Sequence, residues 1–190
     1  LYVVQEDPAA LKELKEKYSL QKYVQKNDLE TYVSLMHWVR DQFPHAQAKK
    51  RPDPQSFDGL KVLENKNEPG YFCGTAAQLL IQSIRSLGGY ARRVELRFTP
   101  KDQHAVVEAW SKELKKWFVL DPDYDVYFTM HSVPQSAAEL HKLWSQNQLA
   151  VLKVHSRVSK HSIFQVRSNE EEAQLSVSYT HLTLPTIITV

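Results

Sequence analysis

The chain has 190 residues, of which 42% are hydrophobic and 11% aromatic. This length and composition suit a single globular domain with an ordinary buried core. The net charge of +2 is too small to indicate binding to nucleic acid or to an anionic membrane surface. No apolar run is long enough to span a bilayer as a helix. We therefore expect neither a nucleic-acid partner nor a membrane-spanning segment.

The N-terminal third predicts two helices followed by a loop. Asp7 and Pro8 are a typical helix start, so we expect an amphipathic helix over residues 9–18. A second helix is predicted over Asp28–Gln42, because apolar residues recur there at helical spacing. Trp38 lies on this helix and is expected in the core. Residues 45–67 have the composition of a loop, with short helical or turn pieces near residues 56–63.

The clearest helix is predicted over Cys73–Leu87. Its apolar residues share one stripe, and Gly88 and Gly89 follow as a stop signal. Small residues directly after Cys73 would let this helix pack closely against a broad surface such as a sheet. The stripe consists of Ala76, Ala77, Leu80, Ile84 and Leu87.

Three strands are predicted after this helix. Residues 90–98 alternate in their second half between apolar and charged side chains, and His104–Trp110 and Trp117–Leu120 follow after short polar turns. Such short connections indicate an antiparallel meander. The start of one strand and the end of the next then meet at one edge of the sheet. His104 and Asp121 are therefore expected to be neighbours.

The C-terminal part predicts a short strand over Val126–Phe128, a helix over Ser136–Ser145 and weaker strands over Gln148–Val154 and Ser162–Val166. Residues 176–190 contain no acidic residue, Lys or Arg, and they resemble the translation of a sequencing adapter, so we expect a non-native tail there. The remainder divides into N-terminal helices and loop (1–68), a core of the Cys73 helix and the antiparallel strands (69–130) and a C-terminal helix with strands (131–175), all within one domain.

Sequence features that suggest a metal-binding site lack the residues that such a site requires. The run Asp121–Asp125 resembles the start of a calcium loop, but Val126 stands where the glycine is required and Ser132 where the closing glutamate is required. Asp123 and Asp125 are therefore interpreted as turn carboxylates. The chain has neither a cysteine pair nor a His-Glu-x-x-His sequence, so no zinc site and no other cofactor is expected. Four further histidines are expected at the surface: His131, His141, His155 and His161.

Cys73 is the single cysteine, so no disulfide can form within the chain. Taken alone, it fits a buried structural thiol, because free cysteine is commonly buried. A single cysteine with a histidine and an aspartate further along also fits a nucleophile, its base and the group that orients the base. The start of a helix favours the reactive thiolate form, and Cys73 is predicted at such a start. The second interpretation assigns these roles to Cys73, His104 and Asp121.

An ordered set of residues resembles the bacterial branch of the transglutaminase-like superfamily. The set combines a glycine-rich entry to a cysteine-led helix, a Gly-Gly-x-Ala-Arg exit and a His-Ala-x-x-Glu-x-Trp strand. Two residues separate Gly70 from Cys73, where the family more often has one. The matching residues are Gly70, Cys73, Gly74, Ala76, Leu79, Leu80, Leu87, Gly88, Ala91, Arg92, His104, Ala105, Glu108, Trp110, Trp117, Asp121 and Pro122.

This resemblance implies an α+β, papain-like fold with a cysteine-led helix packed on an antiparallel sheet. It implies Cys73 as nucleophile, His104 as base and Asp121 as orienting carboxylate, with acyl transfer or hydrolysis at amide bonds of a protein or peptide substrate. The alternative is a non-catalytic binding or scaffold domain of a larger bacterial protein. The resemblance also implies a periplasmic or secreted location.

Overall fold

The computed structural model describes residues 7–42, 58–64, 73–97 and 103–157. It has the α+β architecture that the sequence predicts. The helices are α1 (Pro8–Lys17), α2 (Asp28–Gln42), α3 (Gly59–Glu64), α4 (Cys73–Ser86) and α5 (Ala137–Ser145), with 3₁₀ turns at Leu20–Tyr23 and Leu149–Val151. The strands are β1 (Ala91–Arg97), β2 (Gln103–Ser111), β3 (Lys116–Asp121), β4 (Val126–Met130), β5 (Val133–Pro134) and β6 (Lys153–Ser156).

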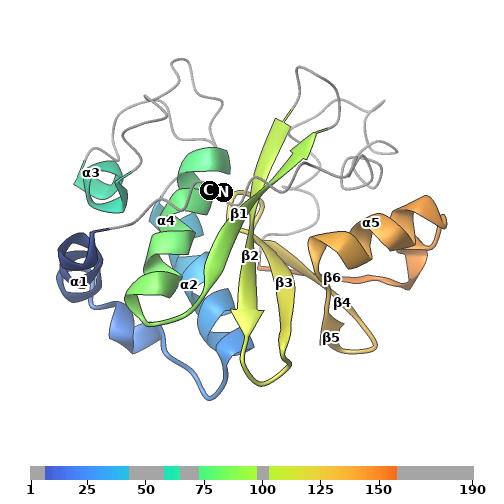
Figure 1. The fold of residues 1–190 in the computed structure, drawn as a ribbon, viewed down its shortest axis with the longest axis horizontal. Coiled ribbons are helices and arrows are strands. Elements are labelled where there is room, and N and C mark those ends of the chain that lie inside the picture. Colours follow the sequence, from blue (N-terminus) through green and yellow to red (C-terminus); the bar gives the residue numbers. More distant parts are fainter. Residues whose placement is uncertain (1–6, 43–57, 65–72, 98–102, 158–190) are drawn as a thin grey trace.

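The sheet separates two hydrophobic cores. Its strands run antiparallel in the order β1-β2-β3-β4-β5, and β6 pairs with β4. Helices α1 to α4 lie on one side of the sheet and α5 on the other (Figure 1). Along β2, Ala105, Val107 and Ala109 face the larger core with α4, whereas Val106 faces the smaller core with α5. Because successive side chains of a strand point to opposite faces of the sheet, β2 contributes residues to both cores.

Helix α4 is the central element of the larger core. It is buried over most of its circumference, because α1, α2, α3, β1 and β2 all pack against it. Gly74, Ala76 and Ala77 are buried in its first turns, where small side chains allow the backbone to approach the sheet closely. The residues Gln78, Gln82 and Arg85, which are not buried, share one narrow stripe, and such a helix is typical of a central position. The predicted close packing of this helix is therefore confirmed.

Gly88 and Gly89 end α4 as predicted. Gly88 has a φ of +81°, and the N–H groups of Gly88 and Gly89 donate to the carbonyls of Arg85 and Ile84 at 2.9 and 3.0 Å. This is a Schellman motif, for which glycine is favoured because its left-handed backbone costs nothing there. A Cβ on Gly89 would lie 2.7 Å from the Cγ2 atom of Ile84. The stop signal is therefore also a close-packing position between α4 and β1.

The N-terminus of helix α5 is hydrogen-bonded to a buried carboxylate of the sheet. Glu108, on β2, accepts a hydrogen bond of 2.8 Å from the N–H of Ala137 and is 3% exposed. Its other oxygen accepts two hydrogen bonds from the Arg92 guanidinium, at 2.7 and 2.9 Å. That guanidinium lies over the Trp117 ring, 4.3 Å from its centre. Ser136 and Glu139 complete the start of α5 with a capping box. Glu108 therefore joins β1, β2 and α5.

Two sequence-based predictions differ from the structure. A strand over Gln148–Val154 is wrong in its first part, because Leu149–Val151 form a 3₁₀ turn and pairing with β4 begins only at Lys153. The N–H groups of Val151 and Leu152 instead donate to the carbonyls of Gln148 and Leu149, three residues earlier in the chain. His155 is not a simple surface residue either. It stacks on Tyr127 at 4.5 Å and hydrogen-bonds the Thr129 hydroxyl at 2.9 Å.

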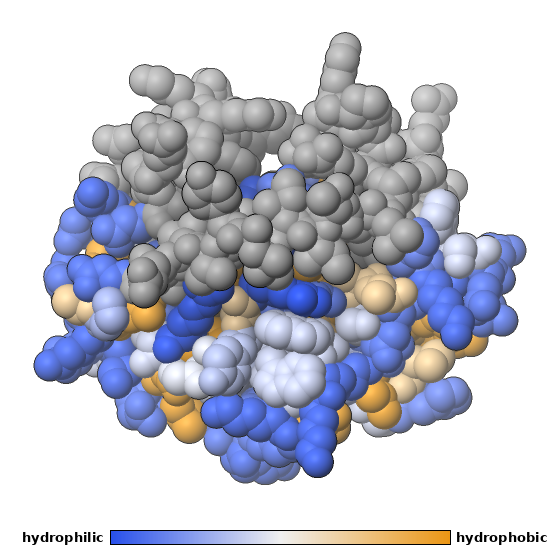
Figure 2. All heavy atoms as spheres, in the orientation of Figure 1, coloured by the Kyte–Doolittle hydropathy of each residue, from blue (hydrophilic) through white to orange (hydrophobic). Residues whose placement is uncertain are grey.

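Other predictions fall outside the described residues. They are the basic run at residues 49–51, the entry residues 70–72, the strand at 162–166, His161 and the tail at 176–190. On the face drawn in Figure 2, hydrophobic residues of the described part lie in separate small areas between hydrophilic ones. Among the described helices, none has the length and apolar character needed to cross a membrane.

Candidate active site

Cys73 is the first residue of α4 and is partly exposed. The first N–H groups of an α-helix have no partner within the helix, and the helix dipole is positive at this end. Both features favour negative charge on a nearby sulfur or on an oxygen of a bound substrate. The structure therefore places the single thiol, partly exposed, at the first residue of α4.

His104 and Asp121 come from adjacent antiparallel strands. The register of β2 and β3 pairs Val107 with Leu120. Extending it by one position brings Asp121 opposite Val106, which is two residues from His104 on the same face of the sheet. Diagonal neighbours of this kind lie within reach of long side chains. The meander predicted from the sequence thus brings the imidazole and the carboxylate together.

The Asp121 carboxylate is held at both oxygens and is fully buried. Its Oδ2 atom lies 2.7 Å from Nε2 of His104. Its Oδ1 atom accepts hydrogen bonds from the N–H groups of Asp123 and Tyr124, at 3.0 and 3.1 Å. The turn after β3 therefore fixes the orientation of the carboxylate, which in turn fixes the imidazole.

The imidazole of His104 connects the carboxylate with the thiol. Burial alone would lower the pKa of His104, but the charge and hydrogen bond of Asp121 outweigh it. The side chain of Cys73 acts in the same direction, so the pKa of His104 is raised well above its ordinary value of 6.5. The structure thus brings His104 and Asp121 into contact, and the assignment of Cys73, His104 and Asp121 to one catalytic set stays a prediction.

Residues 18–122 match the family model of the transglutaminase-like superfamily, which is more than half of the chain. The chain belongs to the transglutaminase-like superfamily. Its cysteine-led helix and antiparallel sheet are the α+β, papain-like arrangement that the sequence predicts for this superfamily. Trp38, on α2 of this transglutaminase-like chain, packs between Tyr18 and Tyr23 in the larger core, as expected from the helical stripe on which it lies.

A comparison with solved structures finds similarity to a provisionally assigned cysteine protease from Cytophaga hutchinsonii. The two are 17% identical, with a TM-score of 0.47. The similarity covers 83% of this chain but 54% of the other, so the transglutaminase-like chain spans about half the length of that protein. No match was found among curated proteins.

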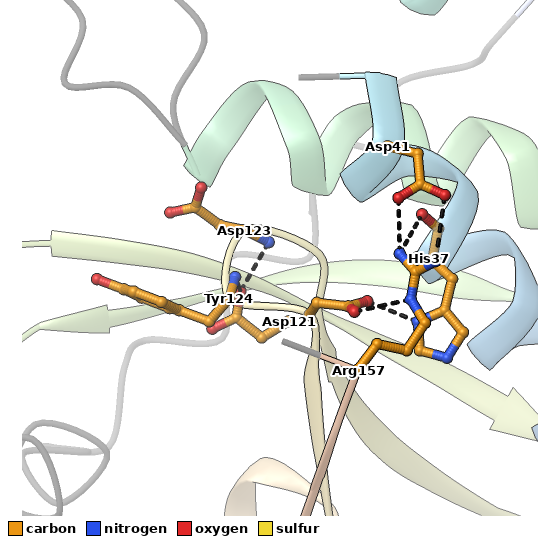
Figure 3. Close-up of polar contacts among 7 residues, drawn as sticks. His37, Asp41, Asp121, Asp123, Tyr124 and Arg157 are labelled. Atoms are coloured by element: carbon orange, nitrogen blue, oxygen red, sulfur yellow. Dashed lines mark hydrogen bonds and ion pairs between the residues drawn. The ribbon is translucent and has the colours of Figure 1, made fainter. Parts of the chain in front are cut away.

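Sequence reasoning missed an ionic cluster beside these residues. Asp125 is in the turn, as predicted, but it is fully buried, and its two oxygens bind different partners. Oδ1 lies 2.6 Å from Nδ1 of His37, and Oδ2 accepts from Nε of Arg157 at 3.0 Å. Arg157 also binds Asp41 through two nitrogens, at 2.8 and 3.2 Å (Figure 3). The partners lie 88 and 32 residues from Asp125, so no local pattern could reveal them.

We expect Asp125 to make the transglutaminase-like domain less stable in acid. Burial would raise the pKa of Asp125, but hydrogen bonds and charges of His37 and Arg157 hold it below its ordinary value of 3.8. The unfolded chain then takes up the proton at a higher pH than the folded protein. The stabilisation is therefore present above pH 3.8 and is lost as the pH falls through the lowered pKa.

The measurement is the melting temperature of the wild type and of Asp125→Asn between pH 7 and pH 3. Over this range the melting temperature of the wild type should fall further than that of the variant, by about 2–4 °C for each kcal/mol of lost stabilisation. Parallel curves would show that another carboxylate causes the acid sensitivity.

Proposed function

We propose that this protein is a thiol enzyme that cleaves amide bonds through an acyl-enzyme intermediate. In this proposal Cys73 is the nucleophile, His104 its base and Asp121 the carboxylate that orients the base. The observation that carries the proposal is the position of His104, which lies 2.7 Å from the Asp121 carboxylate and whose pKa is raised by Asp121 and by the side chain of the single cysteine. Membership in the transglutaminase-like superfamily supports the same assignment.

The reaction starts with proton transfer from the Cys73 thiol to Nδ1 of His104. The thiolate attacks the amide carbon, and the carbonyl oxygen becomes an oxyanion, which the N–H of Cys73 at the start of α4 is placed to receive. As the carbon–nitrogen bond breaks, the imidazolium gives its proton to the leaving amine or ammonia. A thioester between Cys73 and the acyl group results. Throughout, Asp121 stabilises the imidazolium through Nε2.

The second half of the reaction releases the acyl group. Water or a primary amine gives a proton to the imidazole of His104 and attacks the thioester carbon. The carbon–sulfur bond breaks, and the Cys73 thiolate is regenerated. Water yields hydrolysis of a peptide or isopeptide bond, whereas an amine yields transfer of a glutamine acyl group. Both outcomes require the same first half, so the proposal comprises both.

The test uses the reaction of Cys73 with iodoacetamide at pH 5 to 10 in the wild type and in His104→Ala. Because Cys73 is the only cysteine, all alkylation reports on this site. The imidazolium stabilises the thiolate, so wild-type reactivity should persist below the range near pH 8.5 in which ordinary thiols ionise. We expect His104→Ala to react about ten times more slowly at pH 7 and to gain reactivity only near pH 8.5.

His141→Gln is the matched control, because His141 lies on α5 and contacts Trp144 instead of the site. It should follow the wild-type profile. Identical profiles for wild type and His104→Ala would refute an activated thiol and would leave the domain as a binding or scaffold module. A glutamine-containing peptide, with and without a primary amine, then separates transfer from hydrolysis by the mass of the product.

A further inference from the structure

The turn between β3 and β4 carries two buried carboxylates with different partners. Asp121, at its start, accepts hydrogen bonds from the N–H groups of Asp123 and Tyr124, so its orientation depends on the backbone of the turn. Asp125, at its end, points both oxygens at groups outside the turn. Any displacement of the turn would therefore move the carboxylate that binds His104.

Asp125 adopts a backbone conformation that requires support. Its φ is +56°, in the left-handed region, where aspartate is tolerated better than most residues but still at some cost. Such conformations persist when surrounding contacts determine them. The contacts here are the imidazole of His37 at 2.6 Å and the guanidinium of Arg157 at 3.0 Å. These two side chains bind the end of the turn from outside it, next to the pairing of Val126 with Asp121 and Ser156 in the sheet.

The two anchors are themselves fixed to a core helix. His37 is on α2, a helix that is anchored in the larger core by Leu35, Met36 and Val39, all fully buried. Arg157, just after β6, donates to the His37 carbonyl at 3.0 Å and to the Asp41 carboxylate. Figure 3 shows Arg157 reaching Asp41 and His37 on one side of the turn. The turn is thus tied to the larger core through α2.

On its other side, the same turn touches the imidazole. The Tyr124 ring extends away from the ion pairs in Figure 3, and its centre lies 5.2 Å from the centre of the His104 ring at an interplanar angle of 52°. The turn thus contacts His104 twice, through the Asp121 carboxylate and through the Tyr124 ring. Its position sets both contacts at once.

We propose that His37 and Arg157 are positioning residues that, by holding Asp125, fix the turn that orients Asp121 and His104. This inference rests on the proposed function only for its consequence in catalysis, since the orientation of His104 affects a reaction only if Cys73 is the nucleophile. Small displacements of a catalytic group are costly, because about 1 Å of misplacement can reduce a rate by about a hundredfold.

The experiment compares His37→Ala, His37→Asn and Glu64→Gln in the full chain. An asparagine amide nitrogen can donate close to the place of Nδ1 of His37, so His37→Asn is the conservative rescue. Glu64→Gln is the matched control. It removes another ion pair between two elements, the 2.6 Å pair of Glu64 with Lys17, and this pair does not involve the turn. Two properties are measured: alkylation of Cys73 at pH 7, and the titration of His104 by NMR with ¹⁵N-labelled histidine.

We expect His37→Ala to slow alkylation about tenfold and to lower the titration midpoint of His104 by about one pH unit, which corresponds to the same tenfold factor. His37→Asn should recover most of both properties, and Glu64→Gln should leave both unchanged. A folded His37→Ala protein with the wild-type titration and rate would overturn the inference, because a contact that only stabilises the fold moves neither.

Two further outcomes keep this test separate from that of the proposed function. If wild type and His104→Ala alkylate alike, the enzyme proposal fails, and the NMR titration of His104 alone decides whether His37 positions the imidazole. If His37→Ala does not fold, Asp125→Asn replaces it, because asparagine also tolerates the left-handed region but removes the charge opposite Arg157. An unchanged His104 titration in folded Asp125→Asn would likewise overturn the inference.

Discussion

Asp121→Asn is expected to reduce turnover by about a hundredfold to ten-thousandfold while leaving the fold intact. The asparagine oxygen can still accept the hydrogen bonds that the N–H groups of Asp123 and Tyr124 give to Oδ1. Its amide nitrogen then faces Nε2 of His104, where a carboxylate oxygen stood before. Two donors cannot share this contact, so Nε2 must accept and the ring proton moves to Nδ1. That nitrogen can then no longer take the proton of Cys73.

The measurement combines the pH profile of Cys73 alkylation with hydrolysis of a peptide amide. Asp121→Asn should show reduced alkylation at pH 7 and a His104 titration shifted toward lower pH, because the carboxylate charge that raises the pKa of His104 is gone. Asp123→Asn is the matched control in the same turn, because the Asp123 side chain points away from Asp121 (Figure 3). Wild-type alkylation and hydrolysis in Asp121→Asn would remove the carboxylate from the proposed mechanism.

Glu108→Ala is expected to produce the largest loss of stability, about 3–5 kcal/mol in the free energy of unfolding. The substitution leaves the Arg92 guanidinium without its partner beneath α5 and the N–H of Ala137 without its acceptor. The bond from the Ala137 N–H to Glu108 is buried, so this N–H loses its acceptor in the interior, whereas the side chain of Arg92 is 25% exposed. The melting temperature should fall by about 10 °C.

Chemical denaturation and thermal melting measure this loss. Glu64→Ala, which breaks the exposed ion pair with Lys17, should reduce stability far less than Glu108→Ala, because water screens an exposed pair. Joint replacement of Glu108 and Arg92 by leucine should be less harmful than Glu108→Ala, because it leaves no buried charge unpaired. If Glu108→Ala costs no more than Glu64→Ala, the carboxylate does not hold α5 on the sheet. The glutamate of the His-Ala-x-x-Glu-x-Trp strand would then have a role other than holding α5.

The helices and hairpins of this protein were predictable because their signals are local. Asp28–Gln42 has the predicted bounds, and the helix from Cys73 ends one residue earlier than predicted, before the two glycines that stop it. The proximity of His104 and Asp121 was also predictable, since short turns allow only an antiparallel meander and the alternation of side chains is fixed. Leu149–Val151 was mistaken for strand, because apolar composition does not tell whether an opposite strand is available.

The amino-acid sequence by itself determined the superfamily resemblance, the main helices and strands and the three residues proposed for catalysis. Only the tertiary structure decided that the turn carboxylate Asp125 is buried between His37 and Arg157, and that Glu108 carries the start of α5. The physical reason is the distance along the chain over which each kind of interaction acts. Periodicity and turn chemistry act over a few residues, whereas a buried charge is satisfied by whichever groups the packed helices and strands bring within hydrogen-bonding distance.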